Sequence, residues 1–223
     1  MKALVLRTIG TGLVMALSAS CSSPGTSDTP PTDEAVCAAA DVGPPLLRRL
    51  TNLELENTLG DLFPGIKASW QGVKLGVDPV STTGFANDAA VLQVSQQTAQ
   101  EILDTAEEVA GLVTQSAQLG QVLPCSKSGA DRACAETFIT SYGRRLFRRP
   151  LTAAEKADYL SVFDGVLAKS DFATGIKWTL VALIQSPSAI YRSELGVPEG
   201  VARKLTPYEI ATELAYNYSG TTP

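Results

Sequence analysis

Arginine is the side chain most densely grouped in this sequence. Four arginines lie within six residues at helical spacing, so their guanidinium groups would share one side of a helix end. Paired guanidinium N–H donors bind phosphate, sulfate or acidic sugars, which predicts an anion site. The alternative is that they pair with acidic neighbours and favour the C-terminal end of the helix, which the net negative charge of the chain favours. The four residues are Arg144, Arg145, Arg148 and Arg149.

Carboxylates are the second candidate. Glu101, Asp104 and Glu108 recur at helical spacing, which fits a calcium or acid–base site, although a solvated helix face is the commoner outcome. The chain has no histidine, so the commonest general base and the commonest metal ligand are missing. The haem-attachment motif Cys-x-x-Cys-His is therefore excluded within this chain. We expect no catalytic residue, metal ligand or cofactor here.

Cysteines provide the third kind of chemistry. Cys125 and Cys134 are near enough in sequence to close a small loop through a disulfide in an oxidising compartment. A two-cysteine metal site is the alternative, but it lacks further ligands. Cys37 has no evident partner.

The N-terminus is typical of an export signal. A short positive segment precedes an apolar stretch at 9–17, which is too short to span a bilayer, and small residues then precede Cys21. We expect residues 1–20 to be a signal peptide, Cys21 to be the lipid-attachment site, and 21–45 to be a flexible tether. The expected location is the cell envelope, as an outer-membrane or periplasmic lipoprotein; the alternative is a secreted protein.

The net charge limits the kinds of partner that the chain is expected to bind. Without its signal peptide the chain carries 16 Lys and Arg against 23 Asp and Glu, a formal charge of −7. An acidic chain without histidine is a poor nucleic-acid binder, so we expect no nucleic-acid partner. The expected partners are the membrane, through the lipid anchor, and a protein or polysaccharide.

One short phrase, a basic pair followed by Leu-Thr-x-x-Glu, occurs three times, once with a proline after the basic pair. Each copy has the form of a capping box, in which the threonine hydroxyl and the glutamate carboxylate each accept from the other residue's backbone N–H. The phrase therefore predicts three helix starts. The Thr/Glu pairs are Thr51/Glu54, Thr152/Glu155 and Thr206/Glu209.

Apolar residues recur every three or four positions through most of the chain, and few stretches alternate with a period of two. We therefore expect an all-α fold, a bundle of about six helices after the signal peptide and tether. Residues 190–192 fit a short turn or strand. The predicted helices are 52–63, 89–117, 135–147, 153–169, 172–185 and one from 207 onward.

The expected organisation follows from these elements. The final helix has its own capping box and little sequence after it, so we expect it to open a further, truncated domain and the chain to be a fragment. The expected units are 1–20 signal peptide, 21–45 tether, 46–123 N-terminal helical unit, 124–196 second helical unit with the cysteine loop, and 203–223 start of the further domain.

Five segments resemble a known set of exported proteins. The segments are 48–62 (RRLTNLELENTLGDL), 84–88 (GFAND), 138–155 (FITSYGRRLFRRPLTAAE), 183–194 (LIQSPSAIYRSE) and 205–214 (LTPYEIATEL). In this order they are similar to the N-terminal part of large planctomycete and myxobacterial proteins built from domains of unknown function 1587, 1595 and 1592. Some relatives are joined to c-type cytochrome domains, so the resemblance implies a c-type cytochrome partner and supplies no catalytic residue.

Two functions follow as expectations. The first is an exported, lipid-anchored helical module, non-catalytic by itself, that binds a partner or polymer at the cell envelope. The alternative is the N-terminal portion of a larger extracytoplasmic redox or hydrolytic enzyme whose catalytic, haem-linked part lies outside this chain.

Overall fold

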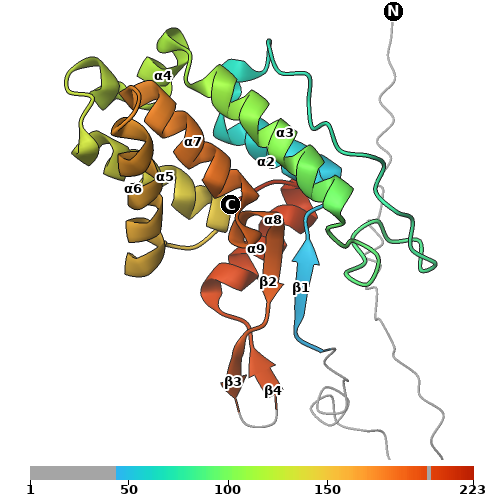
Figure 1. Cartoon of the computed structure of the whole chain (residues 1–223). Coiled ribbons are helices and arrows are strands. Elements are labelled where there is room, and N and C mark those ends of the chain that lie inside the picture. Colours follow the sequence, from blue (N-terminus) through green and yellow to red (C-terminus); the bar gives the residue numbers. More distant parts are fainter. Residues whose placement is uncertain (1–43, 200–201) are drawn as a thin grey trace, which may run out of the picture. The chain divides into compact units, whose positions relative to one another are not determined.

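The three repeated phrases begin helices as predicted. The computed structural model describes residues 44–199 and 202–223 (Figure 1). Thr51, Thr152 and Thr206 each cap a helix, and in each case both hydrogen bonds of the capping box are present. These boxes begin α2 (Asn52–Leu62), α6 (Ala153–Leu167) and α9 (Pro207–Ser219). The predictions on the signal peptide, Cys21, Cys37 and the tether up to residue 43 lie outside the described residues.

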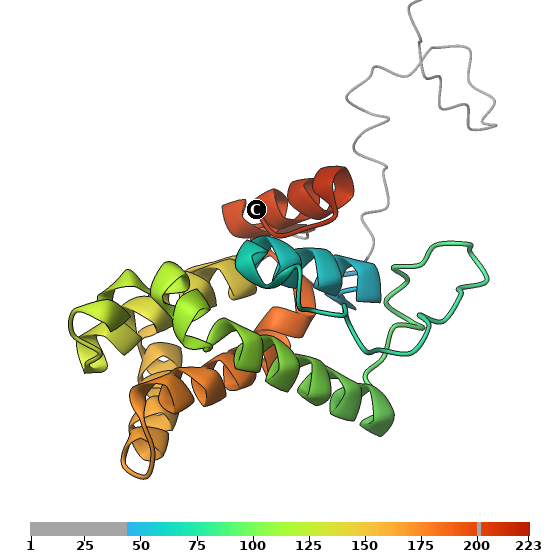
Figure 2. The same ribbon diagram turned by 90° about the horizontal axis from the view of Figure 1, so that it is seen from above.

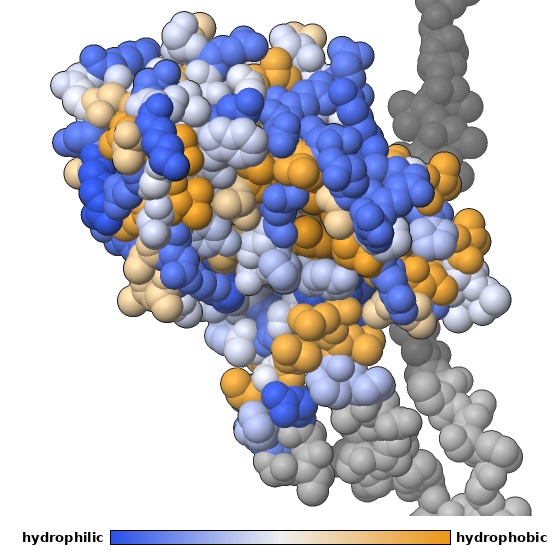
Figure 3. Space-filling view, viewed as in Figure 1, coloured by the Kyte–Doolittle hydropathy of each residue, from blue (hydrophilic) through white to orange (hydrophobic). Residues whose placement is uncertain are grey.

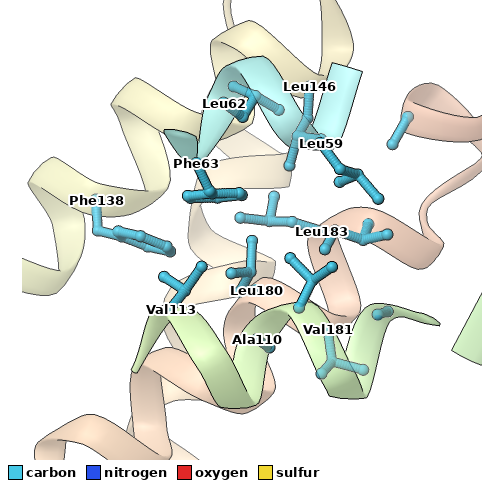
Figure 4. Packing of buried hydrophobic residues seen from close by; sticks show 14 of the residues in the cluster. Leu59, Leu62, Phe63, Ala110, Val113, Phe138, Leu146, Leu180, Val181 and Leu183 are labelled. Carbon is cyan, nitrogen blue, oxygen red and sulfur yellow. The ribbon is translucent and has the colours of Figure 1, made fainter. Parts of the chain in front are cut away.

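Helix α7 (Phe172–Gln185) forms the centre of the apolar core. It packs against α3 (Gln96–Val113), α5 (Arg132–Phe147) and α6. Figures 1 and 2 show α3 and α7 side by side, and Figure 4 shows α2, α3, α5 and α7 sending apolar side chains into one cluster. Members of this core with no measurable exposure include Leu59, Phe63, Val113, Phe138, Leu180 and Leu183.

Two small antiparallel strand pairs correct the expectation of a strictly all-α class. Strand β1 (Leu46–Arg49) pairs with β2 (Tyr191–Glu194), and β3 (Val197–Glu199) pairs with β4 (Ala202–Lys204). The first pairing joins residues from opposite ends of the described chain, so no local period could reveal it. The fold is mostly helical rather than all-α.

The helices also differ in number and length from the prediction. The described residues contain eight α-helices rather than about six, because two short helices, α4 (Ser116–Val122) and α8 (Pro187–Ile190), were not predicted. The expected helix 89–117 is also shorter in the structure, where α3 covers Gln96–Val113. Ser95 caps α3 by accepting from the N–H of Thr98, which moves its start past the expected one. The additional elements are α4 (Ser116–Val122), α8 (Pro187–Ile190) and the 3₁₀ turns Pro64–Ile66 and Pro124–Lys127.

Cys125 and Cys134 form the predicted disulfide, with their Cα atoms 5.8 Å apart. It joins the 3₁₀ turn at Pro124–Lys127 to the first turn of α5. No helix in the described ranges is sufficiently long and apolar to cross a membrane.

Helix α9 packs against β2 and α2. The Tyr216 hydroxyl lies 2.8 Å from the Thr58 hydroxyl of α2, and Tyr216 is 5 % exposed. Asn57 of α2 donates to the carbonyl of Gly220, just past the end of α9. Helix α9 is therefore held by the rest of the described chain, and the assignment of 203–223 to a further domain stays a prediction.

Candidate functional site

Arg148, one of the four clustered arginines, lies inside the fold. It follows the last residue of α5 with a left-handed φ of 58°, and its side chain is buried. Its guanidinium donates to the carbonyls of Ser188, Ala189 and Tyr191, at 2.7, 3.1 and 2.7 Å, where α8 ends and β2 begins. Burial lowers the pKa of Arg148 from its ordinary value. Arg148 thus supplies donors to carbonyls that α8 leaves without helical partners.

Arg149 is engaged by a neighbouring capping box. Its two terminal nitrogens donate to both carboxylate oxygens of Glu155, at 2.9 and 2.7 Å. Hydrogen bonding from Arg149 lowers the pKa of Glu155 to about 2, and the backbone N–H of Thr152 adds to this effect. Glu155 is therefore ionised at neutral pH, and the Arg149 charge is already paired.

Arg144 and Arg145 differ from these two. Both are exposed near the end of α5 and form no salt bridge with any residue in the described part of the chain. Arg145 donates to the carbonyl of Asp61 at 3.4 Å. The structure therefore does not bring the four predicted anion-binding arginines to one site, because two are exposed and two are committed to contacts within the fold.

A polar cluster that the sequence did not reveal holds α9 in place. Arg192 of β2 is 1 % exposed and lies between two carboxylates, 3.5 Å from Glu54 of α2 and 3.7 Å from Glu213 of α9. Burial raises the pKa of Glu213, and the nearby Arg192 charge opposes this rise. The ring of Tyr216 lies 5.2 Å from the Arg192 guanidinium, within cation–π range.

The distribution of polar and apolar side chains on α9 is therefore the opposite of that on an ordinary surface helix. Its inner face carries Glu209, Glu213 and Tyr216, which make polar contacts to the body of the protein. The buried Thr212 on the same face donates to the carbonyl of Tyr208 within α9. Its outer face is apolar, since Ile210, Leu214 and Tyr218 are 45, 53 and 87 % exposed and repeat every four residues. In Figure 2, α9 lies beside α2 at the edge of the described chain, and no other described element covers its outer side. The outer stripe of α9, which we define as Ile210, Ala211, Leu214 and Tyr218, faces solvent.

A pocket of about 520 Å³ lies beside the first turns of α9, bounded by α8, β2 and the end of α5. The carboxylate of Glu209 in its lining already accepts hydrogen bonds from Thr206, Gly196 and Ser193. Burial alone would raise the pKa of Glu209, but these hydrogen bonds lower it to about 2. The apolar rim includes Tyr208, at 45 % exposure. The pocket offers an apolar recess rather than a free charged group.

Elsewhere the surface mixes hydrophobic and hydrophilic residues, and on the face shown in Figure 3 one hydrophobic patch lies next to the β3–β4 hairpin. The carboxylates on α3 are engaged separately: Glu101 accepts from Gly76 N–H, Asp104 from Gln100, and Glu108 pairs with Lys74. In the described ranges no group of three or more histidine, cysteine, aspartate or glutamate residues could hold a metal ion.

The arrangement defines a mostly helical protein with an apolar core and a polar seam beneath α9. Residues 48–115 match the family model PSD3, Protein of unknown function (DUF1587), and residues 134–194 match PSD5, Protein of unknown function (DUF1595). Both matches agree with the resemblance of the sequence to domains 1587 and 1595. No curated protein and no solved structure matches the chain.

The buried cluster was missed because its members look ordinary in sequence. Arg192, Glu54 and Glu213 are far apart along the chain, and the last two sit in helices where a charged residue is expected on the surface. One signal was available: Arg192 follows the apolar run Ala189-Ile190-Tyr191 directly, and an arginine there needs a buried partner.

Proposed function

We propose that this protein is an exported, lipid-anchored helical module that binds a partner protein at the cell envelope through the outer stripe of α9. One observation supports the binding role: α9 keeps its polar residues inside and its apolar residues outside. A contiguous exposed apolar face is characteristic of a protein-interaction site. Leu214 is 53 % exposed, so covering its exposed half with a partner would contribute about 1–1.5 kcal/mol.

The binding role is tested by photo-cross-linking in intact cells. A photoreactive amino acid replaces Leu214, and a matched variant carries it at Ser161, an exposed polar position on α6. We expect a discrete cross-linked species from position 214 and none from position 161, with mass spectrometry identifying the partner. Equal labelling from both positions, or none from either, would contradict a binding role for α9.

Export and anchoring rest on the N-terminal sequence. The positive segment, the short apolar stretch and the small residues before Cys21 support a lipidated N-terminus. Palmitate labelling of the full chain should give a labelled mature protein, and Cys21→Ala should remove the label while leaving the described fold unaffected. An unlabelled wild-type protein of mature length would instead indicate secretion without an anchor.

The same stripe favours a second candidate function. If the chain is the N-terminal portion of a larger redox or hydrolytic enzyme, the outer stripe of α9 is the contact with the catalytic portion. The cross-link from position 214 then joins this chain to a cytochrome-like or hydrolytic polypeptide, or to a later segment of one longer chain. The identity of the cross-linked peptide separates the two functions.

A further inference from the structure

We infer that the partner segment on α9 is an amphipathic protein helix with acidic residues at both ends of its apolar face. This inference rests on the proposed function and specifies the chemistry of the partner. The outer stripe itself carries no charge, so it provides burial but little orientation. Orientation comes from the residues at its two ends.

Both ends of α9 are flanked by basic side chains. Arg203 and Lys204 precede its first turn and are exposed. At the other end the Thr222 hydroxyl donates to the carbonyl of Arg145, at 2.8 Å, which places the end of α5 and its exposed Arg144 and Arg145 beside the end of α9.

These charges are largely uncompensated. Arg144, Arg145 and Arg203 form no salt bridge with any residue in ranges 44–199 and 202–223, while Lys204 has only a 3.8 Å contact to an exposed glutamate. Arg203 donates to the carbonyl of Gly196, which leaves its positive charge unpaired. Charge complementarity therefore favours aspartate or glutamate near both ends of the partner helix.

The length of the surface limits the partner. Thirteen residues of α9 rise about 20 Å, so a partner helix of about four turns covers the stripe and brings its ends level with the basic groups. Helix-in-groove recognition of this kind uses apolar residues at positions i, i+3 or i+4 and i+7.

A second copy of this chain fits less well. A two-fold pairing of antiparallel α9 helices would place Arg203 and Lys204 of one copy opposite Arg144 and Arg145 of the other. Like charges would then meet at both ends of the contact, which disfavours self-association.

A lipid surface also fits less well, although basic ends with an apolar face can bind anionic lipids. Glu56 lies exposed next to Asn57, the residue that bonds to the end of α9. Asp61 is nearby and pairs with Lys67 at 3.5 Å. Anionic lipids favour helices with lysine and arginine on the polar face, whereas α9 itself contains no basic residue and two glutamates.

The experiment uses two fluorescent helical peptides of about 16 residues with the same leucine stripe, one with glutamate and one with lysine at both ends. Binding to the full chain, purified after export, is measured by anisotropy. We expect the glutamate-ended peptide to bind at least about tenfold more tightly at about 50 mM salt, and this preference to shrink at about 500 mM salt.

Two variants separate the contribution of the apolar stripe from that of the basic groups at its end. Leu214→Asp should abolish binding of both peptides, and the double variant Arg144→Glu/Arg145→Glu should reduce or reverse the preference while leaving the stripe intact. Reversible unfolding of each variant checks that the fold is retained.

The outcomes discriminate between this inference and the proposed function. Equal affinity for both peptides, lost in Leu214→Asp, would overturn the acidic-ended partner and leave the binding role standing. Absence of binding by either peptide would overturn the inference, while the cross-link at position 214 judges the binding role independently. A dimer in sedimentation, or binding to anionic vesicles, that Leu214→Asp removes would also overturn the inference, in favour of a second copy or a lipid surface.

Discussion

The two sides of α2 face neighbours of opposite chemistry. Towards α3, α5 and α7, it contributes Leu59 and Leu62 to a continuous apolar cluster. Towards α9, it contributes Glu54 and Thr58 to a seam of charges and hydroxyls. We call these the apolar core and the α9 seam.

The two regions are stabilised by different interactions. The apolar core depends on close packing, which responds weakly to pH and salt. The α9 seam depends on polar and charged groups around the buried Arg192, whose burial is tolerated only while its partners remain in place. Helix α9 can thus be held by polar contacts while its apolar side stays free for a partner.

The largest expected effect is in the apolar core. Phe138→Ala removes a side chain with no measurable exposure that packs against the ring of Tyr142, so it should lower the free energy of unfolding by about 3–5 kcal/mol. Urea denaturation measures this loss, with Ser161→Ala as an exposed control. A loss below about 1 kcal/mol would show that this part of the core can collapse around the cavity.

Arg192→Met should destabilise by about 3 kcal/mol, since it leaves Glu54 and Glu213 close together without their shared cation. The effect should be local: hydrogen exchange should accelerate in α9 more than in α7. The control is Arg48→Met, which removes a more exposed arginine of the same β1–β2 strand pair, where it is paired with Glu194. Uniform acceleration through α7 and α9 would show that the seam and the core unfold as one unit.

We expect the disulfide to stabilise the apolar core and to leave the α9 seam unaffected. Cys125→Ser/Cys134→Ser should lower stability by about 2–3 kcal/mol, because it opens a short loop at the start of α5. Exchange rates in α9 should stay unchanged, since the loop lies away from the seam contacts. Faster exchange in α9 in the double variant would contradict the separation of the two regions.

The pH dependence distinguishes two carboxylates on the same helix. The pKa of Glu209 is lowered to about 2, so its contribution to stability is present above its ordinary value of 4.5 and is lost as the pH falls towards about 2. The pKa of Glu213 is raised by burial, so its contribution has the opposite sign: it favours folding below 4.5 and is lost as the pH rises.

Two variants test these signs. Glu209→Gln should destabilise at pH 7, and the difference from wild type should narrow as the pH falls from 4.5 towards 2. Glu213→Gln should be neutral or stabilising at pH 7, with the difference narrowing in acid. Chemical denaturation at several pH values measures both. The same sign for both variants at pH 7 would refute the assignment of opposite roles.

Local features were predictable from the sequence and distant pairings were not. A capping box spans four residues, so Thr51, Thr152 and Thr206 could be assigned directly, and the disulfide depended only on two nearby cysteines. The apolar run of α7 predicted its bounds because a strong aspartate cap and a proline flank it. In each case the controlling interactions lie within the segment.

The β1–β2 strand pair and the α9 seam depend on contacts between residues far apart in the described chain. Arg48 and Glu194 are 146 positions apart, and Thr58 and Tyr216 are 158 apart. A clustered arginine such as Arg148 looks equally able to bind an anion or cap a helix, and only the position of the α8 carbonyls decides which it contacts. The expected anion cluster could not be divided into buried and exposed members without the fold.

The smallest expected change in stability is on the outer face of α9. Leu214→Asp should lower the free energy of unfolding by no more than about 1 kcal/mol, since the side chain is 53 % exposed and its loss leaves no buried polar group without a partner. Its matched control, Thr212→Asp, lies two residues away on the inner face at 4 % exposure and should destabilise strongly by placing a carboxylate in the seam beside other acids. Denaturation of the isolated protein measures both changes. If Leu214→Asp costs as much as Thr212→Asp, the outer stripe is already covered in the isolated chain, and α9 has no free face to offer a partner.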